Sequence, residues 1–209
     1  MLEPKFDTCF FERYAMVSLS ALLGGHYTNL VNRDRPDLQD EELSLGIEVT
    51  RAIRENKNVA NALVNEMAGE AVKEVNADDL LHINQSGYAY GLGDGSLIGR
   101  NEYEYWSLAL PLMRILEIKM DKVNNGFYGD FNEFDLFVFT KEDLDLNQVK
   151  QTIAFMMEKQ AYQNRFYSRL FISQIQTLFD CDLFTGRYRK FNVSQVQRRQ
   201  FYDQAIQIS

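Results

Sequence analysis

Cysteine and histidine are scarce in this 209-residue chain, which contains two of each. Cys9 and Cys181 stand far apart and lack the paired spacing of zinc sites and redox motifs, so we expect buried, reduced thiols. His26 and His82 are too few for a histidine-based metal site, and no nucleophile lies near either in sequence. We expect both to be packed or on the surface.

Long apolar runs and an excess of positive charge are also missing. No run approaches the roughly 18 apolar residues that span a bilayer, and residues 1–5 do not form a basic segment leading into an apolar one. We therefore expect no membrane partner and a cytoplasmic location. The formal net charge of −8 argues against a simple electrostatic nucleic-acid binder. From Gln163 onward, however, seven basic residues stand beside three acids, so this segment is either a local positive face or a set of ordinary solvated arginines.

The hydrophobic pattern predicts one α/β domain over residues 1–209, long enough to bury a sizeable core. Apolar residues at helical spacing alternate with β-branched and aromatic runs, and glycines cluster at 86–99 in what we interpret as a connector. The expected helices are 7–23, 58–75, 102–125, 146–160 and one that begins at a capping box at Ser194; the expected strands are 26–32, 43–53, 134–140, 167–173, 177–184 and 187–192.

Two acids flank the bend after Pro36 and point to the most specific chemistry in the chain. Asp37 follows the proline, and Glu48 lies on the expected strand 43–53, with Ile47 and Val49 on the opposite face. A bent hairpin can bring the two carboxylates together, and paired carboxylates on a rigid edge suit a hard divalent cation. Glu12 is a third acid, on an otherwise apolar helical stripe, where an unpaired carboxylate is costly.

Glu12 on the first helix, Pro36-Asp37 and then Glu48-Val49-Thr50 resemble the PD-(D/E)XK nuclease superfamily, over roughly residues 7–140. The resemblance implies a restriction-endonuclease-like core: a mixed central sheet flanked by helices, to which residues 141–209 add a β-hairpin and a helix. It also implies that Asp37 and Glu48 bind Mg²⁺ or Mn²⁺ with help from Glu12.

The chain departs from that family's motif at Thr50, where the family carries a lysine. Such a lysine orients the attacking water and offsets charge on the phosphoryl oxygens. Some family members supply it from a neighbouring helix, and Lys119 and Lys122 are the candidates here, since they continue the Leu112/Ile115 stripe of the expected helix 102–125. The implied activity is metal-dependent hydrolysis of phosphodiester bonds by a magnesium-activated water attacking in line.

Several alternatives stay open. Asp37 can shape a turn after the proline, Glu48 can face solvent, and both lysines can extend from a packed helix. The chain can be a catalytically inactive nuclease-fold protein that binds or assembles, as Thr50 and the acidic charge suggest. It can also be an interaction protein with an aromatic partner-facing patch, or a stacking platform for single strands formed by Phe184, Tyr188 and Phe191. The expected partner is nucleic acid, DNA before RNA, and a homodimer is allowed.

Overall fold

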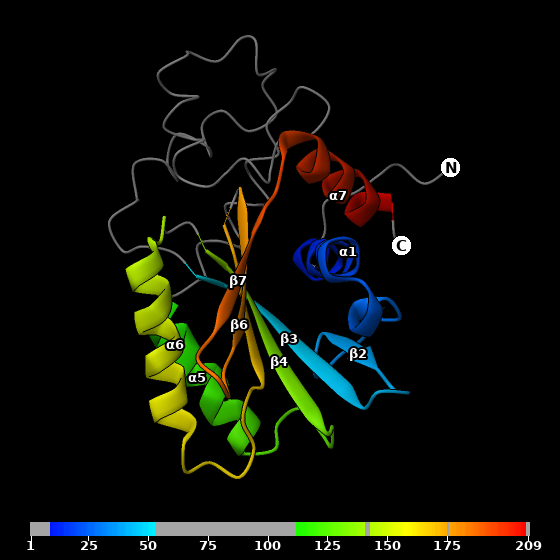
Figure 1. Cartoon of the computed structure of the whole chain (residues 1–209). Helices are drawn as coiled ribbons and strands as arrows, with labels where there is room; N and C mark the ends of the chain where they lie inside the picture. Colours follow the sequence, from blue (N-terminus) through cyan, green and yellow to red (C-terminus); the bar gives the residue numbers. More distant parts are fainter. Residues whose placement is uncertain (1–8, 53–111, 141–142, 175, 208–209) are drawn as a thin grey trace, which may run out of the picture.

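The computed structural model describes residues 9–52, 112–140, 143–174 and 176–207, which form one mixed α/β unit (Figure 1). The expected helix 58–75, the glycine-rich segment 86–99 and His82 lie outside the described residues. The described helices are α1 (Phe10–Leu23), the short 3-10 helix η1 (Gly25–Tyr27), α5 (Leu112–Asn124), α6 (Leu146–Gln160) and α7 (Gln195–Gln207); the strands are β1 (Val31–Asn32), β2 (Leu38–Asp40), β3 (Leu45–Ala52), β4 (Glu133–Thr140), β5 (Arg169–Ser173), β6 (Thr177–Asp182) and β7 (Tyr188–Asn192).

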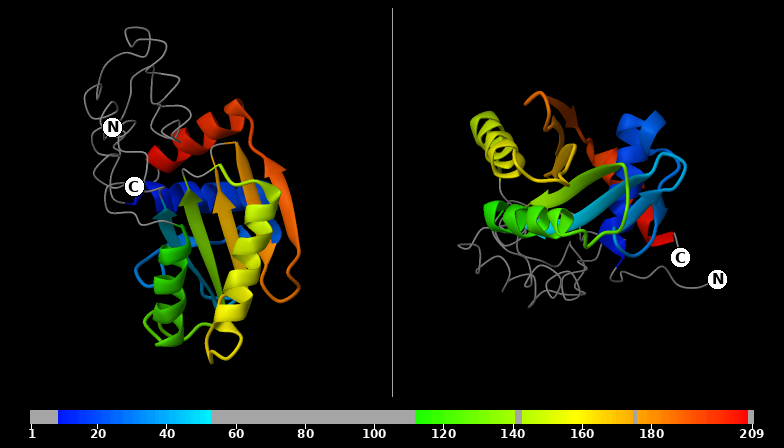
Figure 2. Two further views of the ribbon diagram at one scale, coloured as in Figure 1. Left: turned by 90° about the vertical axis from the view of Figure 1, so that its left-hand side faces the viewer. Right: turned by 90° about the horizontal axis from the view of Figure 1, so that it is seen from below.

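The seven strands form one sheet in the order β1 to β7. The pairs β3–β4 and β4–β5 are parallel and the other four are antiparallel, so the sheet is mixed. Helices α5 and α6 cover one face, and α1 and α7 cover the other (Figure 2). The expected mixed sheet flanked by helices is confirmed in this form, and β5 to β7 extend the same sheet rather than forming a separate layer.

Strand β4 forms the centre because both of its faces are apolar, as expected for a strand covered on two sides. Phe137 and Phe139 pack into the cluster on the α1 side, while Leu136 and Val138 pack into the cluster on the α5 side; all four are fully buried. Two parallel neighbours therefore fix β4 in the middle of the sheet.

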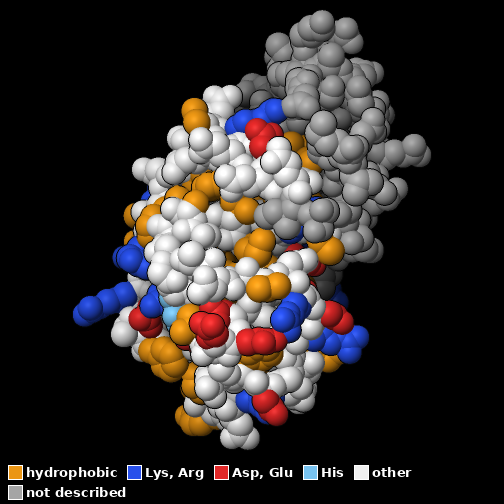
Figure 3. Space-filling model, turned by 90° about the vertical axis from the view of Figure 1, so that its right-hand side faces the viewer, with side chains coloured by type: hydrophobic (Ala, Val, Ile, Leu, Met, Phe, Trp, Pro, Cys, Tyr) orange, Lys and Arg blue, Asp and Glu red, His pale blue; other side chains and the backbone are white. Residues whose placement is uncertain are grey.

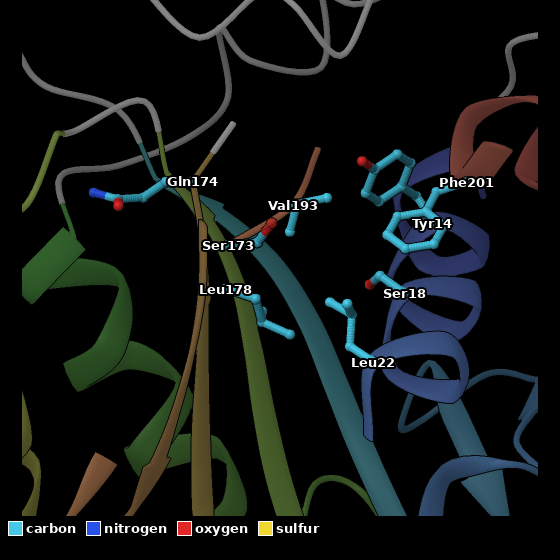
Figure 4. Close-up of a pocket in the computed structure, with 8 residues that line it drawn as sticks. All are labelled: Tyr14, Ser18, Leu22, Ser173, Gln174, Leu178, Val193 and Phe201. Atoms are coloured by element: carbon cyan, nitrogen blue, oxygen red, sulfur yellow. The ribbon is translucent and has the colours of Figure 1, made fainter. Parts of the chain in front are cut away.

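The interface between α1 and the sheet is packed almost without space. Figure 4 shows Tyr14, Ser18 and Leu22 pointing from α1 toward the sheet, with Gln174 turned away from them. The cavity between these groups has a volume of about 10 Å³, the space of roughly one water molecule. It is a packing gap in the core, too small for a ligand.

Most helix ends follow the signals expected from sequence. The capping box of α7 forms, since Ser194 Oγ accepts from the Gln197 amide at 3.2 Å and the Gln197 side chain accepts from the Ser194 amide at 3.0 Å. Gly24 and Gly126 have φ of +60° and +71°, so the chain leaves α1 and α5 through conformations that disfavour other residues. Within the described residues, no helix combines the length and apolarity needed to cross a membrane.

The expected strand 26–32 is wrong. Residues Gly25–Tyr27 form η1, and only Val31–Asn32 are extended. Tyr27 is buried against Phe171 and donates a hydrogen bond to Asp135, so tertiary contacts override its β propensity. The hairpin partner of β3 is the three-residue strand β2, which the sequence pattern did not separate from the bend.

Candidate functional site

Asp37 and Glu48 lie opposite each other across the β2–β3 hairpin. Leu38 pairs with Ile47, so the residue before Leu38 faces the residue after Ile47. The predicted alternation in β3 is confirmed: Ile47 packs into the cluster on the α1 side, while Glu48 contacts Lys119 of α5. The hairpin thus brings the two acids to one point of the sheet edge, as predicted.

Glu48 is held by Lys119. The Lys119 ammonium donates to Oε1 of Glu48, and the two side chains are only 12 % and 9 % exposed. The Lys119 side chain therefore reaches from α5 to the sheet, as the helical spacing suggested. A buried pair of this kind is costly to break from one side, because the remaining charge stays out of water.

Asp37 sits in an environment that opposes its charge. Burial is the main cause that raises its pKa from 3.8 to about 8, and the neighbouring Glu48 carboxylate is the second. The Val49 amide, which donates to Oδ2 of Asp37 at 2.7 Å, acts in the opposite direction, as does the charge of Lys119. Among the described residues, no group donates a hydrogen bond to the other oxygen of Asp37.

Glu12 flanks this pair from α1. Its Oε2 accepts a hydrogen bond from the Asn32 side chain at 2.7 Å, and Asn32 also donates to the backbone carbonyl of Asp37 at 3.0 Å. The pKa of Glu12 is raised, chiefly by burial, and the Glu48 charge adds to the rise. Asn32 therefore links the third acid to the bend, a role for which the sequence carried no local signal.

Lys122 does not join this group. Its ammonium lies 4.9 Å from the ring centre of Phe127, and the guanidinium of Arg35 lies 5.3 Å from the same ring. Phe127 is 47 % exposed, so two cations and an aromatic ring meet at the surface. Arg35 precedes Asp37 by two residues and Lys122 follows Lys119 by one helical turn. This surface therefore lies next to the acidic group formed by Glu12, Asp37 and Glu48.

Two tyrosines that the sequence did not indicate complete the surroundings. Tyr128 is 1 % exposed, and its hydroxyl lies near the side chains of Tyr167 and Glu48. Burial raises its pKa, and the nearby Glu48 charge raises it further. Tyr167 is fully buried and donates to the backbone carbonyl of Lys119 at 3.3 Å, which holds that helical turn against the sheet.

The donor set fits a hard divalent cation in its chemistry. Asp37 and Glu48 offer carboxylate oxygens, and Lys119 is the cation that pairs with Glu48. Mg²⁺ commonly takes one or two protein carboxylates and completes its shell with water and phosphate. Across residues 9–52, 112–140, 143–174 and 176–207, no group of three His, Cys, Asp or Glu side chains is placed to hold a metal ion, so Glu12 does not join Asp37 and Glu48 in a three-ligand set.

Four of the seven basic residues of the C-terminal segment form ion pairs with described acids. Within that segment Arg169 and Arg189 bind Asp180 and Arg199 binds Asp203, while Arg165 reaches Asp130 on the loop before β4. Figure 3, which shows the face on the right of Figure 1, has acidic and basic side chains interspersed rather than a field of one sign. The two cysteines are free thiols, as expected, and Cys181 is buried.

Comparison with known proteins adds no assignment. No protein-family model matches the chain, and no curated protein or solved structure matches it. The resemblance to PD-(D/E)XK nucleases thus stays an expectation from the motif, and the site is interpreted from its own geometry.

Proposed function

We propose that the chain is a metal-dependent phosphodiesterase acting on nucleic acid, with Asp37 and Glu48 as ligands of Mg²⁺ or Mn²⁺. The observation that carries the proposal is the meeting of these two acids across the hairpin, with the Lys119 ammonium on Glu48. Such a set combines hard oxygen ligands with one cation next to them, the arrangement that phosphate hydrolysis requires.

The protein groups have separable tasks in this proposal. Lys119 fixes the Glu48 carboxylate and would offset negative charge on the phosphoryl oxygens. Asp37, with a pKa of about 8, holds a proton at neutral pH and would release it to a base in solvent when a cation binds. A bound divalent cation supplies Lewis-acid activation of water and of the phosphoryl group. Glu12, tied to Asn32, would flank the cation from α1.

The surface next to the site suits the approach of a polyanion. Arg35 and Lys122 place two positive charges beside the site, both against the exposed ring of Phe127, and Arg35 also pairs with the exposed Asp34 at 3.4 Å. These charges would attract phosphates locally even though the chain as a whole carries −8. DNA is the first substrate to test, with RNA as the second.

The decisive assay is cleavage of labelled DNA and RNA, single- and double-stranded, with Mg²⁺ or Mn²⁺. We expect activity that Asp37→Asn and Glu48→Gln each abolish. Glu42→Gln is the matched control, because Glu42 is an exposed acid in the turn of the same hairpin, between β2 and β3. Cleavage that persists in the purified double variant Asp37→Asn/Glu48→Gln would reject this site.

An inactive binding protein with the same site is the second candidate. Thr50 supports it, because Thr50 is half-buried on β3 and cannot supply the charge of the family lysine. Under this alternative the chain binds nucleic acid without cutting it under any of the metal conditions. Binding of DNA by wild type, with no cleavage by wild type, would favour this candidate over the enzyme.

A further inference from the structure

A polar cleft lies away from Asp37 and Glu48, between η1 and the strands β4, β5 and β7. It has a volume of about 310 Å³, and His26, Tyr27, Glu133, Arg169 and Arg189 contribute to its lining. Tyr27 packs on the aromatic core of the α1 side. The Glu48–Lys119 pair, by contrast, depends on α5, which covers the other face of the sheet. The cleft is thus separate from the site above.

Two arginines from different strands converge on one buried carboxylate in this cleft. Arg169 of β5 donates to Oδ1 of Asp180 at 2.8 Å, and Arg189 of β7 donates to Oδ2 through Nε at 3.0 Å and Nη2 at 2.5 Å. Asp180 is 2 % exposed, so both guanidinium groups are anchored from beneath. Their side chains are still 33 % and 64 % exposed, which leaves N–H donors directed toward the cleft.

The two arginines bring two positive charges to a cleft whose surroundings also hold the acids Asp180 and Glu133. Two guanidinium groups face a single carboxylate at Asp180, and Glu133 is already engaged by His26 at 3.1 Å. Asp135 is fully buried behind Tyr27, whose hydroxyl donates to it at 3.0 Å. Burial raises the pKa of Asp135 well above its ordinary range, so its buried position opposes a negative charge behind the arginines.

We propose that this cleft binds a small molecule through a phosphoryl or carboxylate group held by Arg169 and Arg189. Planar guanidinium groups match both oxyanions with paired, charge-assisted hydrogen bonds. Asp180 orients the two guanidinium groups before the ligand binds, which reduces the conformational entropy lost on binding. The volume exceeds that of a bare phosphate and lies at the lower end of small-molecule sites. The ring of Tyr27 then forms a wall for the remainder of the ligand.

The test is calorimetric titration of the full chain, in a buffer free of phosphate and metal, with pyrophosphate, adenosine monophosphate and citrate. We expect one site for at least one of these probes, and the preference between them separates phosphoryl from carboxylate recognition. Arg189→Ala should weaken binding by about tenfold or more, because it removes charged donors. Arg187→Ala is the matched control: it removes the same charge from an exposed residue of the same hairpin, outside the cleft lining.

Arg169→Lys tests the second donor without leaving Asp180 unpaired, and it should weaken binding while circular dichroism shows an intact fold. Absence of binding by wild type to all three probes would overturn the proposal. Equal weakening in Arg187→Ala and Arg189→Ala would also overturn it, since only the general charge would then matter. The proposal does not depend on nuclease activity, and neither result bears on the Asp37–Glu48 site.

Discussion

Replacement of Lys119 by methionine gives the sharpest test of how the acidic group is balanced. Lys119 and Glu48 are 12 % and 9 % exposed, so removal of the ammonium leaves Glu48 buried beside Asp37 and Glu12. Breaking a buried pair from one side costs about 3–5 kcal/mol of unfolding free energy. We expect the lower part of that range for Lys119→Met, because the Glu48 side chain is still 9 % exposed and keeps some contact with water.

Glu48→Gln should cost less, about 1–3 kcal/mol. The reason is that the two partners differ in what remains beside them. Without Glu48, Lys119 still has Asp37 nearby, and the Glu48 charge no longer helps to raise the pKa of Asp37. In the double variant Glu48→Gln/Lys119→Met no charge of the pair remains, so its cost should be below the sum of the two single costs.

Urea denaturation at pH 7 measures all three variants. Lys159→Met is the matched control, because Lys159 pairs with Glu117 at 2.9 Å but both side chains are about half exposed, and exposed pairs of this kind contribute little to stability. If Lys119→Met lowers the unfolding free energy no more than Lys159→Met does, the stabilising role of the buried Lys119–Glu48 pair is refuted. A cost for Glu48→Gln equal to that for Lys119→Met would refute the difference between the two partners.

Three further predictions concern stability. Asp37 binds its proton more tightly in the folded chain, with a pKa of about 8 against an ordinary 3.8, so its contribution to the unfolding free energy falls as pH rises from about 4 to 8. Denaturation across this range should show the stability of Asp37→Asn rising relative to that of wild type. A stability difference that stays constant with pH would contradict the shift. Phe139→Ala should lower the unfolding free energy in urea by about 3–5 kcal/mol, since Phe139 is fully buried, while Phe184→Ala at a 64 % exposed position should lower it far less. Similar losses for the two variants would argue against this core. Asp145→Ala should lower the melting temperature by removing the acceptor of the Gln148 amide, a loss of about 1 kcal/mol that Asp145→Asn should largely avoid.

Much of the sheet and its helices could be predicted from the sequence, because the signals were local. The helix 146–160 matches α6, whose Asp145 cap and Gln148 form a box. The run 134–140 is apolar on both faces and lies at the centre of the sheet as β4, one residue longer at its start. Alternation in β3 correctly separated Glu48 from Ile47 and Val49.

The features that were missed depend on contacts between distant residues. β2 has three residues, too few for a periodic pattern, and its identity comes from pairing with β3. Asn32 and Tyr128 belong to the acidic group only because the fold brings them there. On α5 the buried stripe is Leu112, Leu116, Met120 and Val123, one position away from the predicted Ile115–Lys119–Lys122 line. That rotation places Lys119 at the edge of the interface and Lys122 beside Phe127.

The most direct test of the metal site is titration of Mn²⁺ into the purified chain, with free ion followed by its magnetic resonance signal. The account predicts one Mn²⁺ per chain for wild type and for Glu42→Gln, and binding weaker by about tenfold or more for Asp37→Asn. Asparagine can still accept from the Val49 amide, so the bend should survive the substitution. Equal Mn²⁺ binding by wild type and Asp37→Asn, or none by either, would contradict it.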